Sequence, residues 1–519
     1  MTREEAWKPV DTADSQEIDE SLWEVILGEL YPLPRYQFMN QGALERVSNA
    51  NLTYSYYDLE GQYWSPPSIG YEPTVMPINL ARWFVKKRAA WMFEVAPDIE
   101  CPPESYDPPE MMESESYTPS KKQAKLNRQA STRESILYRI YNDNNLEEKL
   151  LEGTRDHLIG GTVAIRITHS PAHGIRILFK PTQEVFPVYD PDDPEFMTKV
   201  HFCSFLDNDK TIWKQTWELI NGRCYLSEGT YDTNLRPLTT KYTRADTFLD
   251  FIPIILVPNE GLSGDPFGRS YLHDLIPMFD QYNRSMSDAA DALRFNLFAV
   301  TVLLNAAPGA EENLKISPGE VWNVGGEGLD VKKLESSFNY ADALKDFLTR
   351  LENVMHMIGE VPDITPDRIK GFGLVSGVAL KLLYSDLVSA TQQSWRVWKS
   401  RMTTMNEYIF RMLETYSGKP GFYYAKDKKM DVAAIAGDYT TRIIPHLPLP
   451  ENEMENIEME VRRMSSSLQS VKGALQNLGE KYPERKIAEM IGERLKFLGD
   501  GEGFGKMLDR EEKKLMGGL

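Results

Sequence analysis

The longest hydrophobic pattern in the chain lies between residues 376 and 416. Apolar side chains recur there mostly three or four residues apart, the spacing of one face of an α-helix. Ser376 can cap the start of this helix, and about forty residues would make it roughly 60 Å long. A helix of that length is expected to cross more than one domain or subunit. Its apolar positions are Leu380, Leu383, Leu387, Ala390, Trp395, Trp398, Met402, Met405, Ile409 and Leu413.

The residues just before this helix differ in composition. The stretch from Gly359 is rich in proline, glycine and aspartate, and reads GEVPDITPDRIKGFG. The dipeptides Val361-Pro362 and Thr365-Pro366 bias the backbone away from the α region. Because apolar residues at helical spacing fill Tyr340 to Ile358, the pattern predicts a helix, then a loop, then the very long helix.

From Gly160 the apolar period changes to two, which is typical of β-strands. Val163, Ile165 and Ile167 alternate with polar residues, and a Pro/Gly turn separates them from a second alternating run. We therefore expect a β-hairpin and one α+β domain with a single sheet of about a hundred residues. Its other strands are predicted at 185–188, 199–205, 211–220, 224–228 and in FIPIILVPN, residues 251–259.

The remaining segments are predicted mostly as helices separated by turns. Pro277 is placed either in the first turn of its helix or at a kink. In the N-terminal part the predictions are a helix near residues 22–30, a long loop at 51–75, a helix from Pro77 to Phe93 with proline in its first turn, and a helix at 132–152 with a possible turn at 142–145. In the middle they are a helix at 268–297 and a strand-and-turn unit at 299–336 that includes VTVLL and VWNV. After the long helix they are a mixed segment at 419–450 and charged helices at 451–498 with a break at Tyr482-Pro483.

Length and composition bound the architecture. A chain of 519 residues is too long for one core, so about two to four domains are expected. No run of eighteen apolar residues occurs, which predicts no membrane span, and the acidic first residues do not resemble a secretory signal. Cys101, Cys203 and Cys224 are too widely spaced for a disulfide framework or a zinc site, which favours a reducing compartment.

The net charge of −19 argues against broad binding of nucleic acid, because phosphate binding needs a dense Lys/Arg surface. The same charge suits a protein past which DNA must slide without sticking.

Candidate chemical sites are weak, so no catalytic residue, metal or cofactor is predicted. His169 and His173 flank a Pro/Gly turn, where the helical spacing of metal ligands does not apply. The run Asp190–Pro194 lacks the spaced ligands of a calcium loop and indicates a capped turn. The glycines from Gly499 to Gly505 do not follow a strand, so they form no phosphate loop. Met286, Trp395 and Trp398 are interpreted as packing residues.

Three stretches together resemble portal proteins of tailed double-stranded DNA bacteriophages. They are the strand FIPIILVPNEG (251–261), the helix segment DQYNRSMSDAADAL (280–293) with its Asn followed by Ser-Asp, and the junction GEVPD…GFGLVSGVALKLL (359–383). With the helix and hairpin upstream, the resemblance covers residues 77–416. It implies an α+β, predominantly helical portal-type fold.

The resemblance implies parts with set positions. They are a wing at 1–267, a first stem helix at 268–297, a clip at 298–338, a second stem helix at 339–359, a tunnel loop at 360–376, the long helix with a return to the wing at 377–450, and a helical crown with a tail at 451–519.

The implied tunnel loop carries mixed charge. In the functional interpretation, Arg368 and Lys370 make weak, transient contacts with the phosphates of a moving duplex. In the alternative, the loop is an ordinary surface loop whose two cations pair with Asp363 and Asp367. The residues assigned to face DNA are Asp363, Thr365, Asp367, Arg368, Lys370 and Phe372, the hinges are Gly359, Gly371, Gly373 and Gly377, and the docking surface of the clip is Glu311, Glu312, Lys315, Glu320 and Trp322.

The function implied is a non-enzymatic ring, usually of twelve copies, at the capsid vertex. DNA would pass through it without sequence specificity during packaging, retention and ejection. Its expected partners are a terminase motor, then a head-completion or tail adaptor, and the major capsid and scaffold proteins, in the virion and in the host cytoplasm during assembly. Two alternatives stay open: a phage minor structural or adaptor protein without a channel, and a metal-dependent nuclease.

Overall fold

The structure is a computed structural model, and its chain divides into two compact units. Unit 1 contains Met1–Ile364 and Tyr384–Leu447, and unit 2 contains Thr365–Leu383 and Pro448–Leu519. Each unit is described by itself. The residues described are 20–32, 37–66, 73–107, 119–170, 173–193, 195–206, 210–297, 301–304, 330–333, 341–363, 384–417, 430–448, 453–478, 480, 486–487 and 490.

The expected β-hairpin is confirmed, and it forms part of a three-stranded antiparallel sheet. Strand β2 (Thr162–Ser170) lies between β3 (Gly174–Pro181) and β9 (Ile254–Pro258). Ile165 of β2 faces Phe179 on one side and Ile255 on the other. The apolar residues of β9 are buried throughout, which explains why this strand has a continuous hydrophobic run although it lies at the edge of the sheet.

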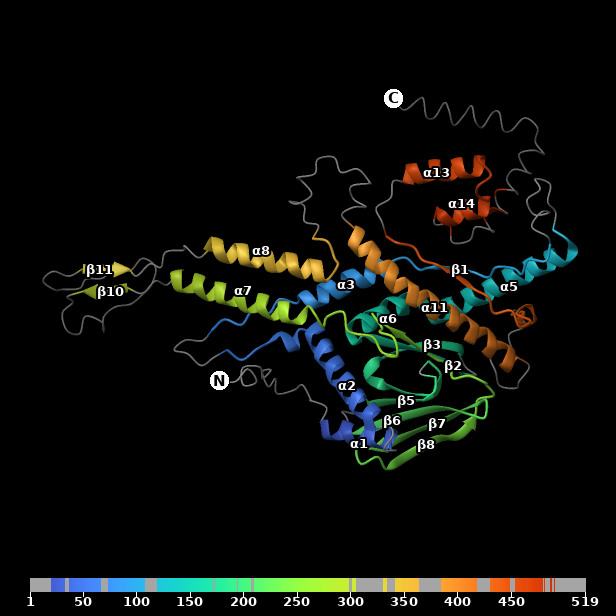
Figure 1. The fold of residues 1–519 in the computed structure, drawn as a ribbon, viewed down its shortest axis with the longest axis horizontal. Coiled ribbons are helices and arrows are strands. Elements are labelled where there is room, and N and C mark those ends of the chain that lie inside the picture. The colour runs from blue at the N-terminus through green and yellow to red at the C-terminus, as the bar shows by residue number, and fades with distance from the viewer. Residues whose placement is uncertain are drawn as a thin grey trace, which may run out of the picture. The chain divides into compact units, whose positions relative to one another are not determined.

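A second sheet carries the other strands, so the expectation of a single sheet was wrong. Its five antiparallel strands follow each other in chain order and are drawn below the hairpin in Figure 1. They are β4 (Val185–Tyr189), β5 (Met197–Leu206), β6 (Thr211–Ile220), β7 (Arg223–Asp232) and β8 (Pro237–Asp246). The sequence did not predict β8, because nearly all of its residues are exposed and it therefore lacks the alternation that marks a half-buried strand.

Five helices of the N-terminal half pack around these sheets. They are α1 (Glu20–Leu30), α2 (Gln37–Tyr57), α3 (Leu80–Phe93), α5 (Lys121–Asn144) and α6 (Leu146–Gly160). The expected turn within 142–145 is confirmed, since Asn145 adopts a left-handed conformation between α5 and α6. Helix α3 is capped by Asn79, whose side chain accepts from the backbone N–H of Arg82, so Pro77 precedes the helix.

The predicted loop at 51–75 was wrong in its first part, because α2 continues to Tyr57. Thr53 is buried there, and its hydroxyl donates to the carbonyl of Ile159 on α6. The Tyr56 hydroxyl donates to Asp280. These tertiary contacts override the weak helical pattern of the segment.

The long helix is confirmed as α11 (Ser385–Tyr416), which has 32 residues and a length of roughly 48 Å. It begins at Ser385 instead of near Ser376, and Tyr384 occupies the N-cap position. The predicted cap, Ser376, and the residues up to 383 lie outside the described part. The interpretation of Trp395 and Trp398 as packing residues is confirmed, since both are buried and their indoles pack against Phe93.

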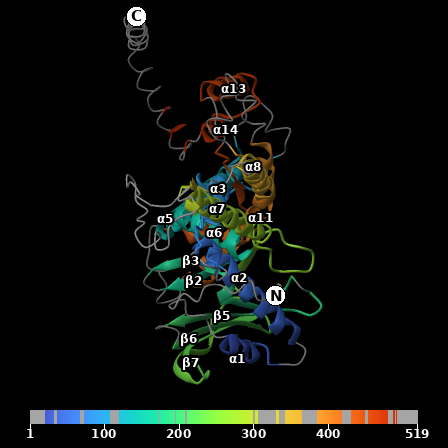
Figure 2. The same ribbon diagram turned by 90° about the vertical axis from the view of Figure 1, so that its left-hand side faces the viewer.

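Two further helices of unit 1 lie side by side, as Figures 1 and 2 show. They are α7 (Ile276–Leu297) and α8 (Ala341–Ile358). Pro277 is the second residue of α7, so it lies in the first turn and causes no kink. Strands β10 (Thr301–Leu304) and β11 (Asp330–Lys333) pair antiparallel in the segment between the two helices. The predicted strand VWNV lies outside the described residues.

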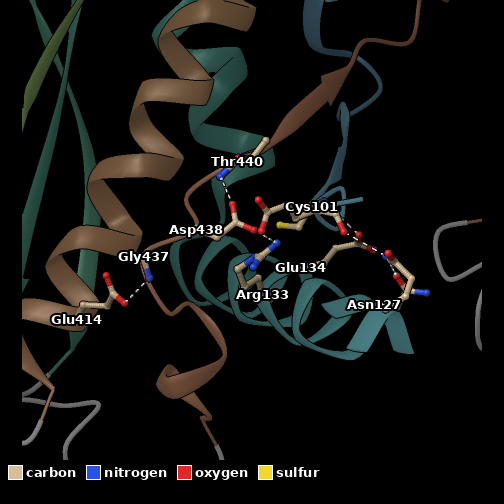
Figure 3. Close-up of polar contacts among 10 residues, drawn as sticks. Cys101, Asn127, Arg133, Glu134, Glu414, Gly437, Asp438 and Thr440 are labelled. Carbon is tan, nitrogen blue, oxygen red and sulfur yellow. Dashed lines mark hydrogen bonds and ion pairs between the residues drawn. The ribbon is translucent and has the colours of Figure 1, made fainter. Parts of the chain in front are cut away.

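The return segment after α11 is fixed between α11 and α5 (Figure 3). Arg133 of α5 forms an ion pair with Asp438 at 2.6 Å, and Glu414 of α11 accepts from the Gly437 backbone N–H at 3.0 Å. The chain then enters β12 (Arg442–Ile444), which pairs with β1 (Asp98–Glu100). Residues 430–447 thereby join the N-terminal half of unit 1.

The described part of unit 2 contains α13 (Glu453–Ser465) and α14 (Val471–Asn477). Buried Glu460 accepts from Arg463 at 2.9 Å and from Asn477 of α14 at 3.1 Å. The helical character predicted for 451–498 is confirmed over these residues, while the predicted break at Tyr482-Pro483 lies outside them.

The three cysteines are buried and form no disulfide. Burial is the largest cause that raises the pKa of each thiol to about 12, so the reactive thiolate is suppressed. Over the residues that the structure describes, no helix combines the length and hydropathy needed to cross a bilayer.

Candidate functional site: the anchor of the segment between α8 and α11

The structure describes only a small part of the predicted site. Asp363 and Gly359 are described, and Gly359 lies directly after α8. The other predicted residues lie outside the described part. They are Thr365, Asp367, Arg368, Lys370, Phe372, Gly371, Gly373, Gly377, Glu311, Glu312, Lys315, Glu320 and Trp322.

What the structure does describe is how both ends of the 364–383 segment are held. We call the holding residues the loop anchor: Phe84, Arg88, Trp91, Tyr271, Gly359, Glu360, Val361, Tyr384 and Leu387. They come from α3, from the segment before α7, from the end of α8 and from the start of α11.

Gly359 is required by a close approach. A Cβ atom added there would lie 2.7 Å from a ring carbon of Phe84. The Tyr271 hydroxyl donates to the Gly359 carbonyl at 2.5 Å. This glycine was predicted as a hinge, and the structure supplies a packing reason for it.

Helix α8 ends in a Schellman motif. The N–H of Val361 donates to the carbonyl of His356, and the N–H of Glu360 donates to Met357. Glu360 occupies the position with positive φ, at 51°, where glycine is usual and another residue costs on the order of 1 kcal/mol. Val361 is buried beside Met355, which completes the hydrophobic contact of this motif.

An ion pair fixes Glu360 in this unusual position. Arg88 of α3 is 4% exposed, and its guanidinium lies 3.2 Å from the Glu360 carboxylate. Two other guanidinium nitrogens of Arg88, Nε and Nη1, have no hydrogen-bond partner among the described residues. Burial, and then the charge of Glu360, raise the pKa of nearby Glu260. The loop anchor therefore holds one buried cation against a carboxylate at the helix end.

The returning end of the segment is held by the same helix α3. The Tyr384 ring packs against Trp91 with centroids 4.8 Å apart. Leu387, in the first turn of α11, is buried in the same hydrophobic cluster as Val361 and Phe84. The described residues on both sides of the 364–383 segment, Val361 and Leu387, thus belong to one hydrophobic cluster.

Replacing Tyr271 by phenylalanine is expected to lower the free energy of unfolding by about 1 kcal/mol, because one buried hydrogen bond to Gly359 is lost. Urea denaturation of the two proteins measures the difference. The matched control is Tyr242→Phe on exposed strand β8, for which we expect almost no change. Equal midpoints for the two variants would contradict a structural role for the Tyr271 hydroxyl.

The second feature is a ladder along α7. Asn283, Ser287 and Asp291 follow each other at four-residue spacing and are buried, and they accept from an extended segment before α3. The backbone N–H of Ile78 donates to Asn283 at 3.0 Å, and that of Met76 donates to Ser287 at 3.1 Å. The N–H of Thr74 donates to Asp291 at 3.1 Å.

The ladder depends on matching repeats. One helical step of four residues rises 6.0 Å, and two residues of extended chain rise about 6.6 Å. Alternate N–H groups can therefore meet successive side chains of α7. Pro73 and Pro77, which have no N–H to donate, occupy the alternate positions.

The ladder explains the Asn, Ser and Asp residues in DQYNRSMSDAADAL. The sequence indicated these residues as a feature of the helix, but it did not predict their partner. The available signal was that these three polar residues recur every four positions and so lie on one face of the helix. The alternation of Pro73 and Pro77 with donors was the matching signal on the other segment.

Asn283→Ala is expected to cost about 2 kcal/mol of unfolding free energy, because it leaves the part-buried N–H of Ile78 without its acceptor and also removes a donor to Gln62. Thermal or urea unfolding measures it. Asp288→Ala, at an exposed position of the same helix, is expected to change stability by less than about 0.5 kcal/mol. A larger effect at Asp288 than at Asn283 would contradict the ladder.

Comparison with known proteins decides the family. Residues 38–479 match the family described as "Phage portal protein, SPP1 Gp6-like". The chain belongs to this portal protein family. The match extends from α2 to α14 and includes the loop anchor and the ladder. As a portal protein, the chain is a structural component of the channel in the virion.

Solved structures of gene transfer agent particles are also similar to the chain. One is described as "Neck of empty GTA particle computed with C6 symmetry", with 11% identity, a TM-score of 0.38, and coverage of 79% of this portal protein and 95% of that chain. Another, "Virion of native gene transfer agent (GTA) particle", has 13% identity, a TM-score of 0.34, and coverage of 64% and 79%. The family assignment rests on the family match alone. No curated protein has significant sequence similarity to the chain.

Proposed function

We propose that this portal protein assembles into a closed ring of twelve copies whose axial opening passes double-stranded DNA during packaging, retention and ejection. The observation that carries the proposal is the family match over residues 38–479. The anchoring of both ends of the 364–383 segment on one cluster supports it further.

The proposal assigns the parts as follows. Helices α7 and α8 form the stem, at 268–297 and 339–359, and β10 and β11 belong to a clip at 298–338. The α+β part at 1–267 is the wing, 360–376 is the tunnel loop, 377–450 holds the long helix and its return, and 451–519 is the crown. The pairing of β12 with β1 supports the return of 430–447 to the wing.

Charge supports passage of DNA without tight binding. The chain has 77 acidic and 58 basic residues. An acidic channel wall repels phosphate and avoids the counterion release that would hold DNA in place. In this setting Arg368 and Lys370 would supply weak, transient phosphate contacts from the tunnel loop, the alternative being that they pair with Asp363 and Asp367.

The ring would work with other phage proteins at the capsid vertex. The clip residues Glu311, Glu312, Lys315, Glu320 and Trp322 would dock the terminase motor and afterwards the head-completion or tail adaptor. The major capsid and scaffold proteins would surround the ring during assembly in the host cytoplasm.

Particle mass in solution tests the ring. We expect a species of about twelve chains, and negative-stain images along its axis with a central opening wide enough for a duplex. A monomer, or an assembly without an axial opening, would favour the adaptor protein without a channel.

A phosphodiesterase assay with Mg²⁺ or Mn²⁺ tests the nuclease alternative, and no cleavage is expected. Two of the buried or partly buried carboxylates on α7 already accept hydrogen bonds, Asp280 from Tyr56 and Asp291 from Thr74. Within the described ranges, no group of three His, Cys, Asp or Glu residues is placed to hold a metal ion. Robust metal-dependent cleavage would contradict a purely structural function.

A further inference from the structure

Helix α8 has exposed apolar side chains on one flank. Phe347 is 44% exposed and Ile358 is 38% exposed. They are eleven residues apart, which is close to three helical turns, so they lie along one line of the helix. The apolar stripe that packs toward α7 contains Leu351 and Met355, which are buried. Phe347 and Ile358 lie at the edge of that stripe, and much of their surface remains exposed.

The opposite flank of α8 contacts α3 at the C-terminal end of α8. His356 is two residues from Ile358, a rotation of about 200°, and its ring packs edge-on against Trp83 with centroids 5.5 Å apart. Trp83 still keeps 38% of its surface exposed. Lys86 and Lys87, one turn further along the same face of α3, are exposed. Neither lysine has an ion pair with any residue that the structure describes.

We infer that these two surfaces are the complementary halves of the contact between neighbouring copies of this chain. The α8 surface (Phe347 and Ile358) of one copy docks on the α3 surface (Trp83, Lys86 and Lys87) of the next. This inference rests on the proposed ring and names the surfaces that would close it.

Three observations support a second copy as the occupant. A closed ring requires each copy to present two different surfaces, because its contacts are head-to-tail. Exposed large apolar side chains mark interaction surfaces when they are grouped; Phe347 and Ile358 lie along one line of α8, and Trp83 lies on α3, which contacts the other flank of α8. A neighbouring copy also carries an excess of carboxylates, which complements the two lysines without ion pairs.

Two full-length variants test the inference by particle mass. The α8 variant is Phe347→Glu with Ile358→Glu, and the α3 variant is Lys86→Glu with Lys87→Glu. Each is expected to lose the ring and to have the mass of one chain, with the far-ultraviolet circular dichroism of the wild type. Mixed together, they are expected to form dimers and nothing larger, because each keeps the surface that the other has lost.

Matched controls exclude a general effect of the new charges. Met357→Glu lies on the same helix between the two flanks and is 71% exposed. Lys121→Glu with Lys122→Glu reverses an adjacent exposed pair on α5. Both controls are expected to form wild-type rings.

Two results would overturn the inference. One is a wild-type ring in either docking variant, and the other is a mixture that stays monomeric although both variants are folded. In both cases the wild-type ring would still stand, so the proposed function would survive. A wild-type protein that forms no ring would contradict the inference and the proposed function together.

Discussion

Replacing Gly268 by alanine is expected to destabilise unit 1 by about 4 kcal/mol or more, at the upper end for a single substitution. A Cβ atom at this position would lie 1.9 Å from the backbone oxygen of Asn259 and 2.3 Å from its nitrogen. Both atoms belong to the main chain, so no side-chain rotation can relieve the overlap. Soluble yield and the midpoint of urea denaturation measure the loss.

The large effect follows from the hydrogen bonds that join the chain at Gly268 and Arg269 to Thr162 and Asn259. The N–H of Gly268 donates to the Thr162 hydroxyl at 2.9 Å. The N–H of Arg269 donates to the Asn259 carbonyl, and the Asn259 amide donates back to Arg269, both at 2.8 Å. Gly161 meets the same segment from the other side, with φ of 74°. A shift of Gly268 would break this junction between the end of β9 and the start of α7.

Gly261→Ala is the matched control for Gly268→Ala. The nearest atom to a Cβ at Gly261 is a Pro258 side-chain carbon at 3.5 Å, an ordinary contact, so we expect a change of less than about 1 kcal/mol. If both glycine variants unfold at the same urea concentration, the crossing at Gly268 does not carry the stability assigned to it.

Deleting residues 365–372 is expected to spare the ring and to reduce packaged or retained DNA to background. The loop anchor lies outside the deletion, so its contacts to Tyr271, Arg88 and Trp91 remain. The twelve residues left between Asp363 and Tyr384 can still span up to roughly 40 Å, so the shortened connection need not strain the anchor. Particle mass measures assembly, and nuclease-protected DNA in assembled heads measures packaging and retention.

A double substitution distinguishes the contribution of the loop itself from that of its two cations. Arg368→Gln with Lys370→Gln keeps the length of the tunnel loop and removes only the predicted phosphate contacts, so we expect a smaller loss of packaged DNA than in the deletion. Wild-type amounts of packaged DNA in the deletion variant would reject the function assigned to this loop.

The sequence predicts those elements of the fold whose burial is periodic. The hairpin β2–β3, the pair α7 and α8, and the long helix α11 have one clearly buried face each. Strand β8 escaped prediction because neither of its faces is well buried. Helix α2 was not predicted either, and its last two turns were interpreted as a loop although Thr53 and Tyr56 are held there by distant partners.

The site is less predictable for the same physical reason. Gly359 was found from composition, but the need for glycine comes from Phe84, which lies far away in the sequence. Arg88 is the third residue of a Lys-Lys-Arg run, and nothing in that run distinguishes the buried cation from the two exposed lysines. Its partnership with Glu360 exists only in the folded chain.

The prolines that alternate with the donors along α7 also prevent slippage. If the extended segment moved by one residue toward its C-terminal end, Pro77 would face Asn283 and Pro73 would face Asp291, and neither proline could donate. Two of the three rungs would then be lost with polar groups left buried, while a shift in the other direction would place Pro77 at Ser287 and lose one rung. The segment can therefore accept almost any side chain at Val75 or Met76 while its alignment on the helix stays unique.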